Sequence, residues 1–175
     1  MTISQQEWPN RFFVLLSGIF IASLVASNLI FQKFFSWDVW LPIIGNYTFE
    51  LSVGILPYPI TFLVTDIISE IYGRKKADQV VVSGFIASVF IMGVVLIADA
   101  APATVWSPVD NALFTKVFGL FGPAVFASMT AYLTAQFIDI RIFHFWKRLT
   151  HSKHLWLRNN GSTIFSQMVD TSSVL

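Results

Sequence analysis

Four long apolar stretches constrain this chain more than any other feature of its sequence. They cover residues 12–31, 51–72, 79–98 and 122–140. Each approaches or exceeds the roughly 20 apolar residues that cross a hydrocarbon core of about 30 Å. Only 12% of the residues are charged and 55% are hydrophobic, which excludes a soluble globular domain. We therefore expect an all-α fold, a polytopic helical membrane protein.

A fifth apolar stretch covers residues 162–175 and is still running where the sequence stops. A helix of about 14 residues measures roughly 21 Å, which is short of a full crossing. We therefore expect five spans in this chain, with the fifth incomplete. Because no tandem repeat divides the sequence, residues 1–175 are expected to form a single transmembrane domain.

The basic residues predict the orientation of the chain, because cytoplasmic loops carry an excess of lysine and arginine. If the spans alternate in direction, nine of the 11 basic residues fall on one side of the membrane. These nine are Arg11, Arg74, Lys75, Lys76, Arg141, Lys147, Arg148, Lys153 and Arg158. The amino terminus is therefore expected in the cytoplasm, and a bacterial inner membrane is the simplest setting.

Two connecting segments are predicted to lie at the opposite membrane surface. Residues 32–50 contain Trp37, Trp40 and Pro42, which indicate interfacial turns with aromatic rings at headgroup level. Residues 110–121 predict a short amphipathic helix on the same surface.

Ionisable residues inside the predicted spans indicate a candidate site. Each costs about 2.5–3.5 kcal/mol at mid-helix, so such residues normally face the bundle interior or a wet cavity. Asp66 and Glu70 lie one helical turn apart on one face of the second span. Two like charges so close repel unless a cation or a ligand donor intervenes. The alternative is an ion pair at headgroup level, with Glu70 bound to Arg74 or Lys75.

The same span contains the motif Pro57-Tyr58-Pro59. Its two prolines remove two backbone donors, so the helix should be kinked or broken there. Transporters commonly place their substrate beside such breaks, which makes Tyr58 a candidate binding residue. The alternative is a simple proline kink.

A polar stripe follows one face of the fourth span. It consists of Ser128, Tyr132, Gln136 and Asp139, at spacings of four, four and three. Ser128 is expected mainly to pack helices together. The amide of Gln136 both donates and accepts hydrogen bonds, which suits the edge of a heteroaromatic ligand.

The fifth stretch carries a second polar stripe. Its members are Ser162, Ser166, Asp170 and Ser173. This face is poorly suited to lipid and is expected to look inward, with Asp170 about two turns inside the helix. Asn160 is a further candidate, although Asn160 or Ser162 could instead cap the amino end of the helix.

The remaining signals for chemistry are weak. The spacing of His151 and His154 could bring two imidazoles together, but the chain has no cysteine and no third ligand at a useful spacing. We therefore expect no metal and no cofactor. The net charge of +1 gives no reason to expect nucleic acid, whereas the basic, tryptophan-containing segment around these histidines favours contact with anionic lipid.

Residues 65–77, 139–143 and 156–171 together resemble the queuosine precursor transporter family, a vitamin-uptake-like family of membrane proteins. The resemblance spans residues 12–175. It implies a six-helix protein that imports 7-deazaguanine bases, the cyano or aminomethyl precursors of queuosine, for salvage into a tRNA modification. The residues point to the same kind of ligand. A flat purine-like base needs a carboxylate or amide for its N–H groups and an aromatic wall on which to stack.

The expected function is therefore small-molecule transport, and not enzymatic catalysis. The candidate substrate-binding residues are Asp66, Glu70, Gln136, Asp170, Tyr132, Asn160 and Tyr58. One alternative is a substrate-capture subunit of an energised vitamin importer, and a more distant one is a membrane enzyme that uses the intramembrane carboxylates. The coupling ion, the preferred precursor and a homo-oligomeric state stay open.

Overall fold

A computed structural model describes residues 3–42, 45–119, 123–150 and 155–174. Within these ranges, the side chains outside the description are those of residues 3–9, 123–128, 155, 157, 167 and 169–174. The described chain is mostly helical. Its elements are α1 (Ile3–Ile30), β1 (Phe34–Leu41), β2 (Gly45–Ser52), the 3₁₀ turn η1 (Val53–Ile55), α2 (Tyr58–Ile71), α3 (Arg74–Ala100), α4 (Asn111–Phe118), α5 (Pro123–Leu149) and α6 (Leu155–Val174).

Three segments of the described chain are long and apolar enough to cross a membrane. They are Asn10–Ile30, Val53–Ile71 and Arg74–Ala100, and they coincide with the first three predicted spans. Helices α5 and α6 contain 27 and 20 residues, but they carry more polar side chains and do not belong to this set. The chain is therefore a helical membrane protein with several apolar helices.

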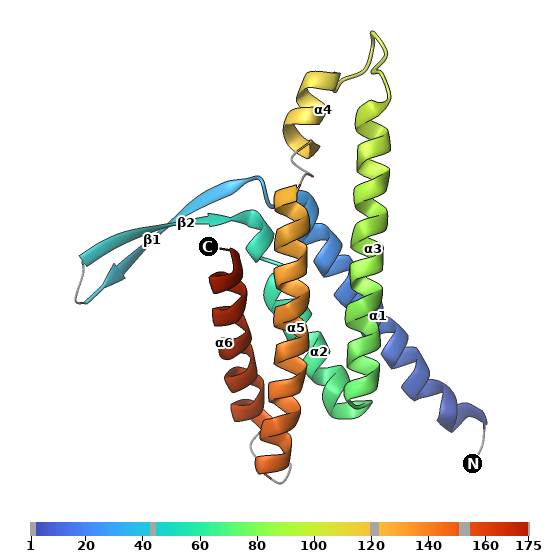
Figure 1. Ribbon diagram of the computed structural model, residues 1–175, viewed down its shortest axis with the longest axis vertical. Helices are drawn as coiled ribbons and strands as arrows, with labels where there is room; N and C mark the ends of the chain where they lie inside the picture. The colour runs from blue at the N-terminus through green and yellow to red at the C-terminus, as the bar shows by residue number, and fades with distance from the viewer. Residues whose placement is uncertain (1–2, 43–44, 120–122, 151–154, 175) are drawn as a thin grey trace.

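The helices run up and down in one bundle (Figure 1). Helix α1 packs against α2 and α3, α5 packs against α6, and α2 and α3 both contact α5. The amino end of α1, the α2–α3 connection, the end of α5 and the start of α6 lie together at one end of the bundle. The hairpin formed by β1 and β2 lies at the opposite end, as does α4. Buried apolar side chains of α1, α2 and α3 form the core between them, including Phe20, Phe62, Ile68 and Val81.

The segment between α1 and α2 is a β-hairpin, so the expectation of an all-α fold is wrong there, and two strands occupy the segment where turns were expected. Strands β1 and β2 pair antiparallel, with Trp37 opposite Phe49. Apolar residues alternate along each strand, which is the period of two that a pleated strand requires. Gly45, at the start of β2, adopts a φ of +81°, a conformation that side chains with a Cβ rarely adopt.

The predicted break at the proline motif is confirmed. The turn η1 ends at Ile55 and α2 begins at Tyr58, so the second span is interrupted where the two prolines lie. The predicted amphipathic helix is also confirmed as α4. The side chain of Asp110 caps it by accepting a hydrogen bond from the Leu113 backbone N–H at 2.7 Å.

The last two helices extend beyond their predicted bounds. Helix α5 continues to Leu149, and α6 begins at Leu155. Asn160 and Ser162 therefore lie inside α6, and the interpretation of either as its cap is wrong. Apolar length predicts where a helix leaves lipid, but backbone hydrogen bonding continues through the polar residues beyond that point.

We predict that Gly54→Ala destabilises the protein. A Cβ at this position would lie 2.8 Å from Phe31 Cβ and 2.9 Å from the Ser27 carbonyl oxygen, so α1 would have to move. The expected loss in the free energy of unfolding is about 1–3 kcal/mol. It should appear as a lower Tm of the protein in detergent.

Gly93→Ala is the matched control, because a Cβ there has no neighbouring atom within 4 Å. Alanine also favours a helix over glycine, so the Tm of this variant should be unchanged or slightly raised. Equal Tm values for the two variants would show that α1 does not pack tightly on Gly54.

Candidate functional site

A column of buried polar side chains runs along the interface of α2, α5 and α6. Its members recur three or four residues apart, so each helix turns one polar face inward. Each is at most 4% exposed. The polar column consists of Thr61, Thr65, Asp66 and Ser69 from α2, Gln136 and Asp139 from α5, and Arg158, Ser162 and Ser166 from α6.

Three aromatic rings surround the first turn of α2, at the end of the column nearest the hairpin. The Tyr58 and Tyr132 rings meet edge to face, with centroids 5.0 Å apart. Phe62 lies 6.0 Å from Tyr58 and 6.2 Å from Tyr132, measured between ring centroids. The break at the prolines places Tyr58 at the start of α2, where it reaches α5.

The amide of Gln136 forms the next layer of the column. Its Nε2 donates to the Tyr132 hydroxyl at 2.8 Å and to Thr61 Oγ1 at 3.3 Å. Its Oε1 accepts from Thr65 Oγ1 at 3.3 Å. The partners are hydroxyl groups, which can both donate and accept. The amide is therefore held by groups that can adapt to a ligand with mixed hydrogen-bonding edges.

Two carboxylates form the centre of the column. Asp139 Oδ1 accepts from the Ser166 hydroxyl at 3.1 Å, and Ser162 lies within reach of the same carboxylate. Asp66 lies beside Asp139, and Arg158 is close enough to attract it electrostatically. Among the described residues, no amide, hydroxyl or basic group donates to either oxygen of Asp66. A buried acceptor of this kind suits a ligand with N–H donors.

An ion cluster closes the column at the end where α5 finishes and α6 begins. Glu70 Oε2 lies 2.8 Å from Lys147 Nζ and 3.3 Å from an Arg158 guanidinium nitrogen. The Arg158 guanidinium also stacks on the buried Phe143 ring, 5.3 Å from its centroid. The ion-pair interpretation of Glu70 was therefore right in kind and wrong in its partners, because Arg74 pairs with Asp78 instead.

The structure brings together four of the predicted site residues: Asp66, Gln136, Tyr132 and Tyr58. Glu70 belongs to the ion cluster. Asn160 is exposed on α6, away from the buried face. The side chain of Asp170 lies outside those that the structure describes, and His151 and His154 lie outside the described residues altogether. Within the described ranges, no group of three acidic or histidine side chains could hold a metal ion.

Several residues of the column were not predicted as site residues. Asp139 was recognised only as part of a stripe, and Arg158 was assigned to a basic loop although it is 1% exposed. Arg158 lies four residues before Ser162, which itself lies four before Ser166. A helix that begins at Leu155 carries Arg158 on the same face as Ser162 and Ser166. The spacing of four is therefore the signal that could have identified Arg158.

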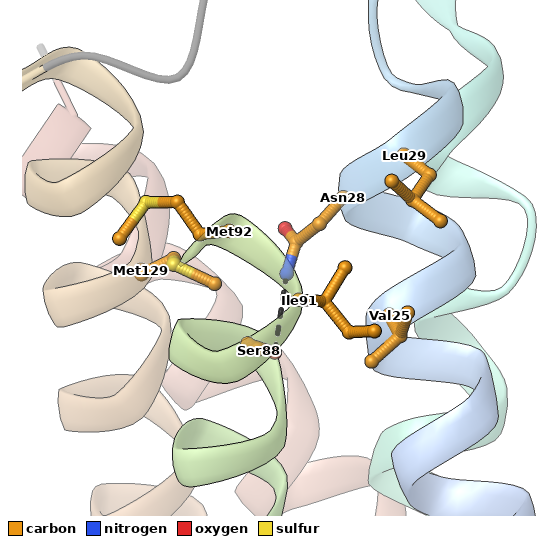
Figure 2. Close-up of a pocket in the computed structure, with 7 residues that line it drawn as sticks. All are labelled: Val25, Asn28, Leu29, Ser88, Ile91, Met92 and Met129. Carbon is orange, nitrogen blue, oxygen red and sulfur yellow. Dashed lines mark hydrogen bonds between the residues drawn. The ribbon is translucent and has the colours of Figure 1, made fainter. Parts of the chain in front are cut away.

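A separate small cavity lies between α1, α3 and α5 (Figure 2). Its volume is about 10 Å³, which is room for about one water molecule. Asn28 Nδ2 and Ser88 Oγ lie 3.5 Å apart across its wall. Asn28 therefore joins α1 to α3. The cavity is too small for a purine-like base, so the polar column is the better candidate site.

These features define the class: a multi-pass membrane protein with a buried polar column among its helices. A profile of the family described as "Putative vitamin uptake transporter" matches residues 52–175, which include the whole column. The chain belongs to this family of membrane transporters.

Named relatives agree with this assignment. The chain is 31% identical over 124 residues to a "Probable queuosine precursor transporter" of Bacillus subtilis, covering 69% of this chain and 52% of that relative. It is 27% identical over 183 residues to a protein of the same name from Haemophilus influenzae, with coverages of 97% and 70%. It is 29% identical over 136 residues to the "Queuosine precursor transporter" of Escherichia coli, with coverages of 73% and 58%.

The chain thus spans between 52% and 70% of the length of these relatives. No solved structure matches it.

We predict that Glu70→Gln destabilises the protein by about 2 kcal/mol. This is less than the roughly 3–5 kcal/mol typical of a fully buried pair, because the Glu70 side chain is 32% exposed. The loss arises because Arg158, with a side chain 1% exposed, keeps its charge but loses the carboxylate with which it forms an ion pair. The measurement is the Tm in detergent.

Asp78→Asn is the matched control, since it breaks the more exposed Arg74–Asp78 pair, whose side chains are 45% and 33% exposed. An exposed pair contributes about 0.5 kcal/mol or less, so the Tm should barely change. A Glu70→Gln variant as stable as this control would show that the ion cluster does not hold α6 to α2.

Proposed function

We propose that this chain imports queuosine precursors, the 7-deazaguanine bases, across the cytoplasmic membrane. The printed names of the relatives support the substrate class. The observation that carries the proposal is the Asp66 carboxylate, which is 4% exposed and lacks a donor partner in the described chain apart from its contact with Asp139. A buried carboxylate in this state is an acceptor prepared for a ligand.

The chemistry of the base matches the layers of the column. A 7-deazaguanine carries a ring N–H next to an exocyclic amine, and one carboxylate can accept from both. Asp66 is proposed to bind this edge. The Gln136 amide is proposed to read the edge with mixed donors and acceptors, and the rings of Tyr58 and Tyr132 to stack on its faces.

Transport requires the column to open. Its side chains contact one another directly, so a base can bind only when the packing of α2 against α5 and α6 loosens. The path from Tyr58 to Glu70 covers 13 residues of α2, which corresponds to a rise of roughly 18 Å along the helix. We propose that the helices separate first at one end of this path and then at the other, as alternating access requires.

The architecture that we propose has five spans in one transmembrane domain, at residues 12–31, 51–72, 79–98, 122–140 and 162–175. The amino terminus is proposed to face the cytoplasm of a bacterial inner membrane. The clustering of the basic segments supports this orientation. The start of α1, the α2–α3 connection and the facing ends of α5 and α6 share one end of the bundle (Figure 1).

We predict that Asp66→Asn reduces uptake of a radiolabelled deazaguanine base at least tenfold. Asparagine keeps the shape of the side chain but replaces one acceptor oxygen with a donor, which loses about 1–3 kcal/mol of hydrogen bonding to the base. Uptake is measured in cells that lack transporters of this family, with the amount of protein in the membrane quantified.

Asp99→Asn is the control, because Asp99 bonds Thr115 at 2.6 Å on the surface, far along the chain from the column. It should transport normally. Unchanged uptake in Asp66→Asn would contradict the proposed binding role. Uptake by the purified protein alone in liposomes separates a transporter from a capture subunit that needs an ATPase partner.

A further inference from the structure

The hairpin formed by β1 and β2 has two chemically different faces. Residues paired across an antiparallel ladder lie on the same face. On one face every pair is apolar or aromatic: Phe35 with Leu51, Trp37 with Phe49, and Val39 with Tyr47. We call this the aromatic face.

The opposite face is largely polar and acidic. Ser36 pairs with Glu50 and Asp38 with Thr48, while the two end pairs each hold one apolar residue, Phe34 with Ser52 and Trp40 with Asn46. The Thr48 hydroxyl donates to Asp38 Oδ1 at 2.6 Å across the strands, which fixes the register on this side.

The aromatic face is open in the structure. Trp37 is 60% exposed, Tyr47 is 48% exposed and Phe49 is 39% exposed. Figure 1 shows the hairpin leaving the bundle and projecting well beyond the helices. A two-stranded hairpin is marginally stable on its own in water, so this face needs a partner that covers it.

The base of the hairpin lies where two membrane spans end. The first span finishes at Ile30 and the second begins at Val53. The Val53 backbone N–H donates to the Lys33 carbonyl at 2.7 Å, and Ser52 Oγ donates to the Phe31 carbonyl. The hairpin is therefore held at the boundary between hydrocarbon and water.

Exposed apolar side chains continue from the spans onto the hairpin. They are Ile30, Ile55 and Leu56 at the ends of the spans, and Phe34 at the base of the opposite face of the hairpin. The aromatic face ends at the Phe35–Leu51 pair, close along the chain to these apolar residues, which favours lipid over another protein as its partner.

We propose that the aromatic face of the hairpin inserts into the lipid interface of the bilayer that the helices cross. Trp37 and Tyr47 have amphipathic rings of the kind that concentrate at headgroup level. Asp38 and Glu50, on the other face, then point into water. The hairpin acts as a surface anchor, and it fixes the start of α2 and with it Tyr58 of the candidate site.

The absence of cysteine from the sequence makes this proposal directly testable. Val39→Cys and Phe49→Cys place a single thiol on the aromatic face, and Ser36→Cys and Thr48→Cys are the matched controls on the polar face. Each variant is labelled with an environment-sensitive fluorophore. The protein is then reconstituted into vesicles of phosphatidylethanolamine and phosphatidylglycerol.

Lipids with a spin label on the acyl chain should quench labels at positions 39 and 49 at least twofold more than labels at positions 36 and 48. Aqueous iodide should show the opposite order. Equal quenching on both faces would overturn the proposal. Protection of positions 39 and 49 from both quenchers would also overturn it, because protein, either a second copy or another segment, would then cover the face.

Discussion

The buried carboxylates of Asp66 and Asp139 impose the constraint on which the rest of the structure depends. A polar group exposed to hydrocarbon costs several kcal/mol, so the helices that carry such groups must turn them toward one another. Helices α2, α5 and α6 do this along one shared interface. Their opposite faces, and most of α1 and α3, are left apolar and suited to lipid.

The order of the side-chain groups along this interface explains how the helices can hold charged residues at membrane depth. The rings of Tyr58 and Tyr132 close one end, and the ion cluster of Glu70, Lys147 and Arg158 closes the other. The small hydroxyls of α6 let its backbone approach α5 closely while they bond to Asp139. Of the carboxylates whose side chains the structure describes, only Asp66 combines deep burial with the lack of a donor other than its carboxyl neighbour. A ligand that donates hydrogen bonds to Asp66 would therefore offset the cost of burying it.

The sequence predicts the features that follow from helical spacing, and misses one local hairpin and one pairing between distant helices. Apolar length and the two prolines predict the first three spans and the break before Tyr58, and a helical period places Tyr132 and Gln136 on one face. The hairpin is missed although its strands pair locally, because Trp37, Trp40 and Pro42 were interpreted as interfacial turns and the period of two along each strand was not weighed. Arg158 is missed because hydropathy assigns a basic residue to a loop, whereas the partner that allows its burial, Glu70, lies on another helix.

The central claim is that Asp66 binds a purine-like base within the column formed by α2, α5 and α6. Calorimetric titration of the detergent-purified protein with 7-cyano-7-deazaguanine tests it most directly, with the Asp66→Asn variant titrated alongside. The account predicts saturable binding of one base per chain, weakened at least tenfold in the variant. Equal affinity of the two proteins for the base would contradict it.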